Sequence, residues 1–455
     1  MKSKTVSAAP RICWRTAKRR LISASGGPLF EPKMTKFPSK FLAALALSLA
    51  PFMALGNGLR LPSQDGFATA RGEAFVATAD NPSAIYYNPA GLTQSTNTQL
   101  RSGIYGLYYD PTYQPPKGAP NEGKTYGAKK NFAASPQFFF SSKLKGLPVT
   151  AGLGIYAPYG GAMSWPSDTG FRTVGTQSSL TYVRINPAAA VKLCDQLSFG
   201  AGVMVDYAKI DLQQGLRPFP QPLVNYFRFK GDGWSVGYNF GLLWQPIEQI
   251  SIGATLRTQT HFTMNGNTSM QQQPIIGATA LPATMDFKFP LTTVFGVSYR
   301  PTPKWNLEVD ADYTDWSSFG TSTIRQSGAP PFPVQQNIPV HFGWEASWMF
   351  EFGATRYFDN GWHASVGYTF DQNSVPNTYY TPLVADMDRH FVSFGAGHSG
   401  KLFDFDLTYQ IGYGPNHTVA GSQPSSTPGL FSGQRADGTY AFFSQAIMVT
   451  MGMHF

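Results

Sequence analysis

The last seventeen residues of the chain alternate between apolar and mixed positions. Counting back from the terminal Phe455, the apolar set is Met453, Met451, Val449, Ile447, Phe443 and Ala441, interrupted by Gln445. A β-strand turns alternate side chains to opposite faces, so this segment has one apolar face. A strand long enough to cross a bilayer that ends on an aromatic residue is typical of the closing strand of an outer-membrane barrel.

The same alternation recurs along the chain. Residues 197–207, 250–256, 305–313 and 403–413 carry apolar side chains at every second position. In 305–313 the opposite face holds Glu308, Asp310 and Asp312. Soluble β-sandwiches alternate as well, so the periodicity predicts strands without identifying a membrane.

Two kinds of connection follow one another in strict alternation. Short turns fall near residues 145–148, 193–196, 246–249, 301–304, 359–361 and 399–401. Longer polar segments run over 111–131, 159–178, 211–225, 264–282, 317–337, 373–386 and 415–437. Outer-membrane barrels have short periplasmic turns and longer external loops, whereas a soluble sandwich has no reason to keep its short turns at one end. Seven long and six short connections predict an all-β fold, a transmembrane antiparallel β-barrel of about fourteen strands over residues 99–455.

The interior of such a barrel has to be filled or left open. Hydrocarbon offers backbone groups no hydrogen-bond partner, so the sheet must close on itself. Fourteen strands enclose more space than side chains fill, since about eight already close around a packed interior. Residues 57–98 are small, polar and Ala-rich, and they are too few to hold a core of their own. We therefore predict that they form an N-terminal hatch that plugs the lumen.

The positive charge of the chain is confined to its start. Residues 1–56 hold ten of the 35 Lys and Arg but only one acid, Glu31, so the remaining chain has 25 of each and is neutral. This balance predicts no nucleic-acid partner. Lys36 and Lys40 followed by the apolar run 41–50 indicate a signal peptide cleaved before Asn57, and Met34 is an alternative true start. The mean hydropathy of -0.19 argues against a helical membrane protein, because spanning helices are apolar throughout.

Four segments carry a family resemblance. They are residues 72–92, which include Asn88-Pro89-Ala90; residues 182–188 leading to 197–202; residues 312–319; and Asp386-Met387-Asp388-Arg389. In this order and spacing, over residues 57–455, the chain resembles the FadL/TodX (OmpP1) family of outer-membrane transporters of long-chain fatty acids and aromatic hydrocarbons. The resemblance implies a monomeric fourteen-strand barrel blocked by a hatch. It also implies that ligand binds inside the barrel and leaves sideways into the membrane through a gap in the wall.

The resemblance places this gap in the third strand, near the hatch residues Asn88, Pro89 and Ala90. The third strand is expected over 149–156, and the candidate lateral portal follows it: Ala157, Pro158, Tyr159, Gly160 and Gly161. Proline has no N–H for a ladder and glycine relaxes the backbone, so pairing should be interrupted there. Asn88 is expected to bond the freed backbone groups. A second interpretation, in which Pro158 only starts the next loop, stays open.

Other charged groups invite chemistry but have structural interpretations. The acidic row Glu308, Asp310 and Asp312 should face the lumen, neutralised by arginines such as Arg257 or Arg184. Arg389, between Asp386 and Asp388, is either an ion-paired wall residue or a partner for a ligand headgroup. The histidines lack metal-ligand spacing, so we predict no metal site and no cofactor. Aromatic loop residues Tyr379-Tyr380 and Pro330-Pro331-Phe332 are candidates for lining a capture groove.

The sequence therefore predicts a non-enzymatic channel in the outer membrane of a Gram-negative-type bacterium, surrounded by outer-membrane lipid. Its expected ligand is a hydrophobic small molecule, with long-chain fatty acids first and aromatic hydrocarbons as the alternative. Two functions of other classes stay open: a general diffusion porin, which would lack a plug, and a lipid-modifying enzyme, which would need a Ser/His/Asp-type set.

Overall fold

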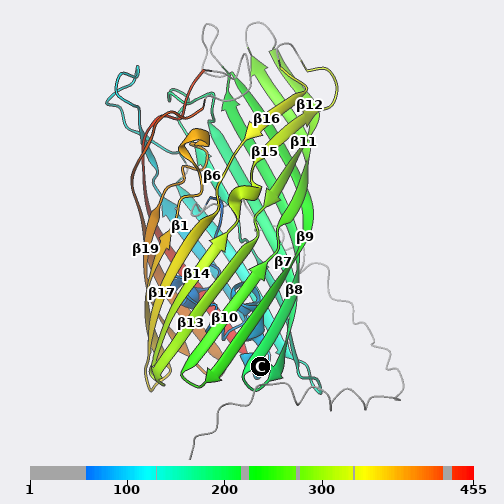
Figure 1. Ribbon diagram of the computed structural model, residues 1–455, viewed down its shortest axis with the longest axis vertical. Helices are drawn as coiled ribbons and strands as arrows, with labels where there is room; N and C mark the ends of the chain where they lie inside the picture. The colour runs from blue at the N-terminus through cyan, green and yellow to red at the C-terminus, as the bar shows by residue number, and fades with distance from the viewer. Residues whose placement is uncertain (1–57, 130, 217–224, 273–276, 331–333, 424–432) are drawn as a thin grey trace, which may run out of the picture.

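The computed structural model describes residues 58–455 except 130, 217–224, 273–276, 331–333 and 424–432 (Figure 1). The predicted leader, residues 1–56, and the start of the hatch at residue 57 lie outside the described residues. Among the described residues, no helix is both long and apolar enough to cross a membrane.

The described chain forms a closed antiparallel barrel, as predicted (Figure 1). Several of the fourteen strands are built from two segments. In chain order they are β1 (Gln99–Tyr109) with β2 (Thr112–Gln114), β3 (Tyr126–Gly127) with β4 (Phe132–Lys143), β5 (Val149–Tyr156) with β6 (Gly161–Ser164), β7 (Gln177–Cys194), β8 (Leu197–Gly215), β9 (Tyr226–Ile247), β10 (Ile250–Arg257) with β11 (Thr260–Gln272), β12 (Gly277–Phe289) with β13 (Thr292–Thr302), β14 (Trp305–Thr314) with β15 (Thr321–Gln326), β16 (Asn337–His341) with β17 (Ser347–Tyr357), β18 (Trp362–Asp371), β19 (Arg389–Ser399), β20 (Phe403–Val419) and β21 (Gly438–His454). The first strand closes the barrel on the last, with β1 paired to β21 from Gln99↔His454 to Tyr109↔Ser444.

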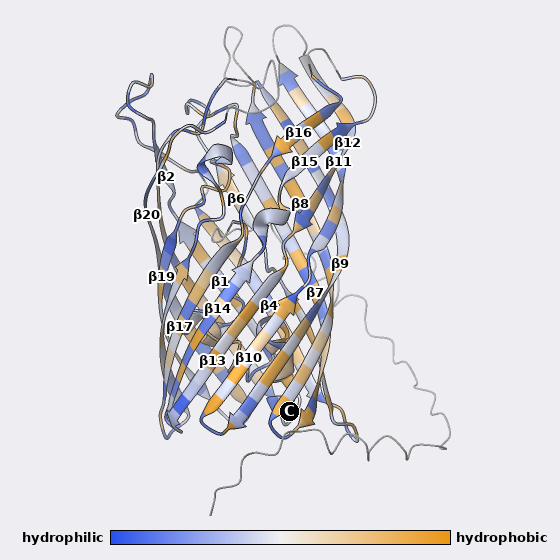
Figure 2. Ribbon diagram, in the orientation of Figure 1, coloured by the Kyte–Doolittle hydropathy of each residue, from blue (hydrophilic) through white to orange (hydrophobic). Residues whose placement is uncertain are grey.

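The outer face of the barrel is apolar over a band that matches a bilayer. On β9 the outward side chains are Trp234, Val236, Tyr238, Phe240, Leu242 and Trp244, each exposed by at least 38%. Ten residues of tilted strand span roughly 25 Å, the height of the apolar band in outer-membrane barrels. Figure 2 shows apolar and polar residues alternating along the strands. The buried inward positions are polar at some levels, as at Asn239 and Thr255, and apolar at others, as at Phe229 and Phe287.

Six of the seven predicted long connections contain strand residues in the structure. Residues 264–282 are mostly strand, because β11 and β12 pair from Thr260↔Phe289 to Gln272↔Gly277. Likewise β8 continues to Gly215 and β20 to Val419. Polar residues beyond the membrane still pair their backbones, so Gln and Asn content alone does not end a strand.

The hatch segment, residues 58–98, lies inside the barrel in the half that contains the C-terminus (Figure 1). It contains the short helices α2 (Gly66–Ala70) and α3 (Ala84–Tyr87) and the 3₁₀ helix η1 (Pro89–Gln94). Asp65 begins α2, since its side chain accepts from the N–H groups of Phe67 and Ala68. All residues of α2 and α3 are buried.

Glycines on the inner wall let the hatch backbone lie against the strands. A Cβ at Gly367 would lie 1.9 Å from Gly72 N, and a Cβ at Gly253 would lie 2.1 Å from Val76 O. Gly200 meets Pro89 in the same way, at 2.3 Å from its carbonyl carbon. No side chain fits at these positions, because the hatch backbone occupies the space that a Cβ would need.

The membrane embedding predicts the effect of a charge on the outer face. Phe240→Arg, near the middle of the apolar band, is expected to lower the free energy of unfolding in lipid vesicles by about 2–4 kcal/mol. Thr302→Arg, at the exposed end of β13, should change it by less than about 0.5 kcal/mol. Urea titration of both variants measures the difference. Equal effects would contradict a lipid-facing position for Phe240.

Candidate ligand channel and its hatch

The acidic row on β14 holds the hatch segment. Glu308, Asp310 and Asp312 point inward and are at most 2% exposed. Arg71 of the hatch donates from Nη2 to Glu308 Oε2 at 2.9 Å, and Arg60 of the hatch pairs with Asp312. Two buried ion pairs therefore join the hatch to a single strand of the wall.

Hatch backbone groups complete this contact. The N–H groups of Phe75 and Val76 both donate to Asp310 Oδ2 at 2.8 Å. The N–H of Ala77 donates to Glu308 Oε1 at 2.7 Å. These donors lie just after the turn that follows α2, where the chain makes no ladder of its own, so the carboxylates satisfy backbone groups that the hatch leaves free.

The arginines expected to neutralise this row have other partners. Arg184 pairs with Asp206 at 2.7 Å, and Arg257 donates to the carbonyl of Tyr86 and to Thr292. Strand position alone suggested Arg184 and Arg257, whereas the counter-charges come from the hatch itself. The expectation for Arg184 and Arg257 was wrong.

Asn88, Pro89 and Ala90 lie against β8 and β9. Asn88 Nδ2 donates to the carbonyls of Val76 at 2.8 Å and Leu242 at 2.9 Å, and its Oδ1 accepts from Ala90 N at 3.1 Å. This side chain therefore joins two parts of the hatch to the wall. It begins η1, where Pro89 supplies the first helical position.

The third spanning strand is interrupted where the sequence predicted a break. β5 pairs with β4 over Phe138–Lys143 and with β7 over Arg184–Val191. After Tyr156 the chain leaves β4, and pairing resumes only between β6 and β7, from Gly161↔Leu180 to Ser164↔Gln177. Among the described strands, β4 has no partner on this side for residues 132–137. The break at 157–160 therefore lies within the strand, and Pro158 does not start an external loop.

Hatch backbone supplies the missing partners at this break. Leu61 N donates to Pro158 O at 2.9 Å, and Gly160 N donates to Leu59 O at 2.9 Å, so Arg60 and Tyr159 face each other as an antiparallel bridge. Gln64 Nε2 donates to Ala157 O at 2.9 Å. The expectation that Asn88 bonds these freed groups was wrong, because its donors are used on Val76 and Leu242.

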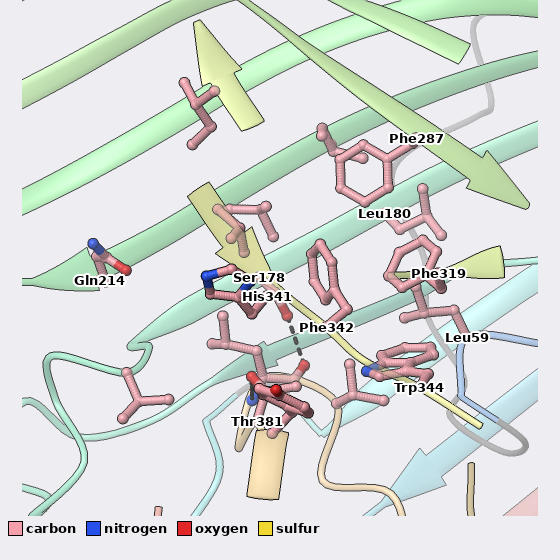
Figure 3. Close-up of a pocket in the computed structure, with 18 of the residues that line it drawn as sticks. Leu59, Ser178, Leu180, Gln214, Phe287, Phe319, His341, Phe342, Trp344 and Thr381 are labelled. Carbon is pink, nitrogen blue, oxygen red and sulfur yellow. Dashed lines mark hydrogen bonds between the residues drawn. The ribbon is translucent and has the colours of Figure 1, made fainter. Parts of the chain in front are cut away.

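A cavity of about 170 Å³ is lined by Leu59 of the hatch and by side chains from several strands and connections (Figure 3). Its walls are mostly apolar, including Leu180, Phe287, Phe319, Phe342 and Trp344. None of its described lining residues is Lys or Arg. An apolar enclosure of this size is suited to a hydrocarbon group.

The cavity reaches both the hatch and the break. Leu59 and Gly161 are lining residues, and Leu59 O is the acceptor of Gly160 N. Tyr159 packs its ring 4.9 Å from that of Phe289, another lining residue. One short stretch of hatch thus touches the cavity on one side and the interrupted strand on the other.

The third predicted group does not line the cavity. Arg389 is fully buried, its Nη1 is 3.6 Å from Asp386 Oδ1, and its guanidinium lies 4.3 Å from the centre of the Phe442 ring. Asp388 accepts from Asn373 N at 2.8 Å. None of Asp386, Asp388 and Arg389 is a lining residue. In the described chain, no three His, Cys, Asp or Glu side chains gather in a way that suits a metal ion.

Sequence reasoning found some lining residues and missed others. Tyr379 and Tyr380 do line the cavity, whereas Pro330 does not, and Pro331 and Phe332 of the same motif lie outside the described residues. Leu180, Phe287 and Phe342 were missed, because they come from separate strands and connections that only the closed barrel brings together. The sequence signal that could have found them is an apolar residue at an inward position near the end of a strand.

Comparison with known proteins now identifies the family. The family model described as outer membrane protein transport protein (OMPP1/FadL/TodX) matches residues 48–454. The chain belongs to this family. It is therefore an outer-membrane protein of a family that transports hydrophobic compounds.

Named relatives are distant but match along most of their length. The long-chain fatty acid transport protein of Escherichia coli O6:H1 is 24% identical over 415 residues, which cover 82% of this chain and 90% of the relative. That of Salmonella typhi is 23% identical over 413 residues, covering 83% and 92%.

Solved structures share the fold. A FadL homologue from Pseudomonas aeruginosa has a TM-score of 0.76 at 18% identity, covering 88% of this chain and all of the other. The toluene transporter TbuX of Ralstonia pickettii has a TM-score of 0.62 at 18% identity, covering 86% and 98%.

Removing a hatch arginine should loosen the hatch. Arg71→Ala leaves Glu308 buried without its counter-charge, and we expect the free energy of local hatch unfolding to fall by about 3–5 kcal/mol. Arg300→Ala is the matched control, since Arg300 is 3.6 Å from hatch residue Asp80 but both side chains are more than a third exposed. Arg300→Ala should lower the free energy of local hatch unfolding by less than about 1 kcal/mol. Hydrogen exchange of hatch amides measures both; similar losses would refute the buried pair as the stronger contact.

Glu73 makes the hatch sensitive to pH. Its carboxylate accepts from Ser63 Oγ and Tyr87 OH, each at 2.8 Å. Burial raises the pKa of Glu73 from 4.5 to about 7, and the two hydroxyl donors only partly oppose this. Because the folded pKa is raised, the protonated carboxyl stabilises the hatch fully below pH 4.5, and this stabilisation is lost as the pH rises through about 7.

Hydrogen exchange at about pH 5 and about pH 8, corrected for intrinsic rates, should show a hatch less stable at the higher pH by roughly 3 kcal/mol. Glu73→Gln is the control, since the amide does not titrate and should remove this pH dependence. A dependence that persists in Glu73→Gln would assign it to other groups.

Proposed function

We propose that this protein takes up hydrophobic compounds passively, by binding them in the cavity and releasing them sideways through the break in the third strand. The observation that supports this most directly is the position of Leu59. Its side chain lines the cavity, and its carbonyl accepts from Gly160 at the break. A ligand that displaces Leu59 would therefore free the portal residues Ala157, Pro158, Tyr159, Gly160 and Gly161.

Apolar burial supplies the driving force. Each CH₂ removed from water contributes about 0.8 kcal/mol, so an acyl chain or aromatic ring enters an apolar cavity without an energy source. The lipid outside the barrel is equally apolar, and release into it costs little. Transport then requires only that ligand shifts the hatch from its docked to a displaced arrangement.

Asn88, Pro89 and Ala90 are proposed gating residues of the hatch. Their contacts with Leu242, Gly200 and Gly241 hold η1 against the wall. Any displacement of this part of the hatch has to break them. Arg389 and Asp386 are proposed as a wall ion pair rather than a headgroup site, because they lie 3.6 Å apart and do not line the cavity.

Long-chain fatty acids are the first candidate ligand, supported by the names of the curated relatives. Aromatic hydrocarbons are the second. The described lining, which holds no Lys, Arg, Asp or Glu, favours them, and a dry apolar cavity of about 150 Å³ is known to hold benzene. We propose transport without catalysis, by a monomer in contact with outer-membrane lipid.

We also propose that residues 1–56 are removed as a leader that ends in a signal peptide. Gly58 is buried in the lumen, and its N–H donates to Asp386 Oδ2 at 3.2 Å. The proposed units are therefore the hatch, 57–98, and the barrel, 99–455.

Locking the hatch to the break should stop uptake. Arg60 and Tyr159 form a non-hydrogen-bonded antiparallel pair, whose Cα atoms are typically about 4.5 Å apart, within the range for a disulfide. In cells that express the Arg60→Cys, Tyr159→Cys double variant, we expect at least a tenfold loss of oleate and toluene uptake when oxidised. Reduction of the same cells should restore it.

Arg60→Ala alone serves as the control for the lost pair with Asp312. Unchanged uptake in the oxidised variant would refute release at this break. Conductance in planar bilayers distinguishes this proposal from a general diffusion porin, since a barrel with its hatch in place should pass almost no ions.

A further inference from the structure

Two buried hydrogen-bond donors in the cavity have no protein partner. They are the indole Nε1 of Trp344 and the hydroxyl of Tyr380, whose residues are 3% and 2% exposed. Within the described part of the chain neither atom has a hydrogen-bond partner. Both residues line the cavity.

A buried polar group without a hydrogen-bond partner is unusual. The great majority of such groups are bonded, and leaving one unbonded costs about 1–3 kcal/mol. Ser178, a buried hydroxyl in the same cavity, follows the rule by donating to Leu383 O at 2.8 Å, the dashed line in Figure 3. Trp344 and Tyr380 are therefore the two lining side chains that a bound molecule has reason to satisfy.

Neighbouring rings fix both donors in place. Trp344 packs 4.9 Å from Trp316 and 4.7 Å from Phe319, and Figure 3 shows its nitrogen-bearing edge turned toward the other lining side chains. The ring of Tyr380 packs 5.6 Å from that of His417 and 4.8 Å from that of Tyr440. Burial, together with the carboxylate of Asp386, raises the pKa of Tyr380, so its hydroxyl keeps its proton and remains a donor.

An indole N–H can only donate, so the missing partner is an acceptor. A carboxylate is disfavoured, because none of the described lining side chains is Lys or Arg to offset the cost of burying its charge. A bare hydrocarbon leaves both donors unbonded. The chemistry that satisfies the site is an uncharged oxygen on an apolar body.

We propose that the cavity selects uncharged apolar molecules that carry an oxygen acceptor, such as a ketone, ester or un-ionised acid, and that Trp344 and Tyr380 donate to this oxygen. This inference rests on the proposed function, because it assumes that the cavity is the ligand site. It adds a polar specificity element to a site that otherwise recognises only apolar bulk.

Acetophenone and cumene are probes for this oxygen site. They have the same number of heavy atoms, and acetophenone has a carbonyl oxygen where cumene has a methyl group. Equilibrium dialysis of protein in nanodiscs, against empty nanodiscs, gives the ratio of the two affinities. We expect this ratio to fall by about 3- to 10-fold in Trp344→Phe and in Tyr380→Phe, the loss of one hydrogen bond. Tyr238→Phe and Trp305→Phe, on the outer face, are matched controls that should leave the ratio unchanged.

Each outcome is decisive. A ratio that stays the same in Trp344→Phe and Tyr380→Phe, with both probes still bound, overturns the oxygen site and leaves the proposed function standing. Binding of neither probe to the unaltered protein overturns both. Tyr380→Phe removes a single oxygen, so a folding failure of the tryptophan variant would not prevent the test.

Discussion

The need to bond every backbone N–H and C=O group governs this structure. In hydrocarbon there is no water to take an unpaired group, so the sheet closes β1 on β21 and leaves no edge there. The third strand is the exception, since β4 lacks a partner beside residues 157–160. Leu59, Leu61 and Gln64 of the hatch bond the groups that the break frees. The hatch is therefore part of the wall at this point as well as a filling for the lumen.

The rest of the hatch is held by charge and by fit. Arg60 and Arg71 are matched to Asp312 and Glu308, where an unmatched charge would be costly. Wall glycines such as Gly253 and Gly367 admit its backbone to within contact of the strands. These features place a compact segment without a core of its own in one position, and Glu73 makes that position sensitive to pH.

The sequence predicted the barrel well, because its signals are local and repeated. Alternation and the order of short and long connections depend on the bilayer, and they predicted fourteen strands. The break after Tyr156 was expected from the family resemblance and from Pro158, with a loop start as the open alternative. Contacts between distant segments were harder. Asn88 was assigned to the break and instead bonds Leu242, and the partners of the acidic row were sought on the wall instead of in the hatch. Which inward residue meets which hatch residue depends on the shape of the lumen, and no period in the sequence encodes it.

Hydrogen exchange at the Leu61 and Gly160 amides tests the central claim most directly, because these two N–H groups join the hatch to the interrupted strand. The account predicts that saturating oleate or toluene speeds exchange at both amides and leaves the β1–β21 ladder unchanged. Exchange at Leu61 and Gly160 that stays as slow as in the ladder, under conditions where uptake proceeds, would contradict it.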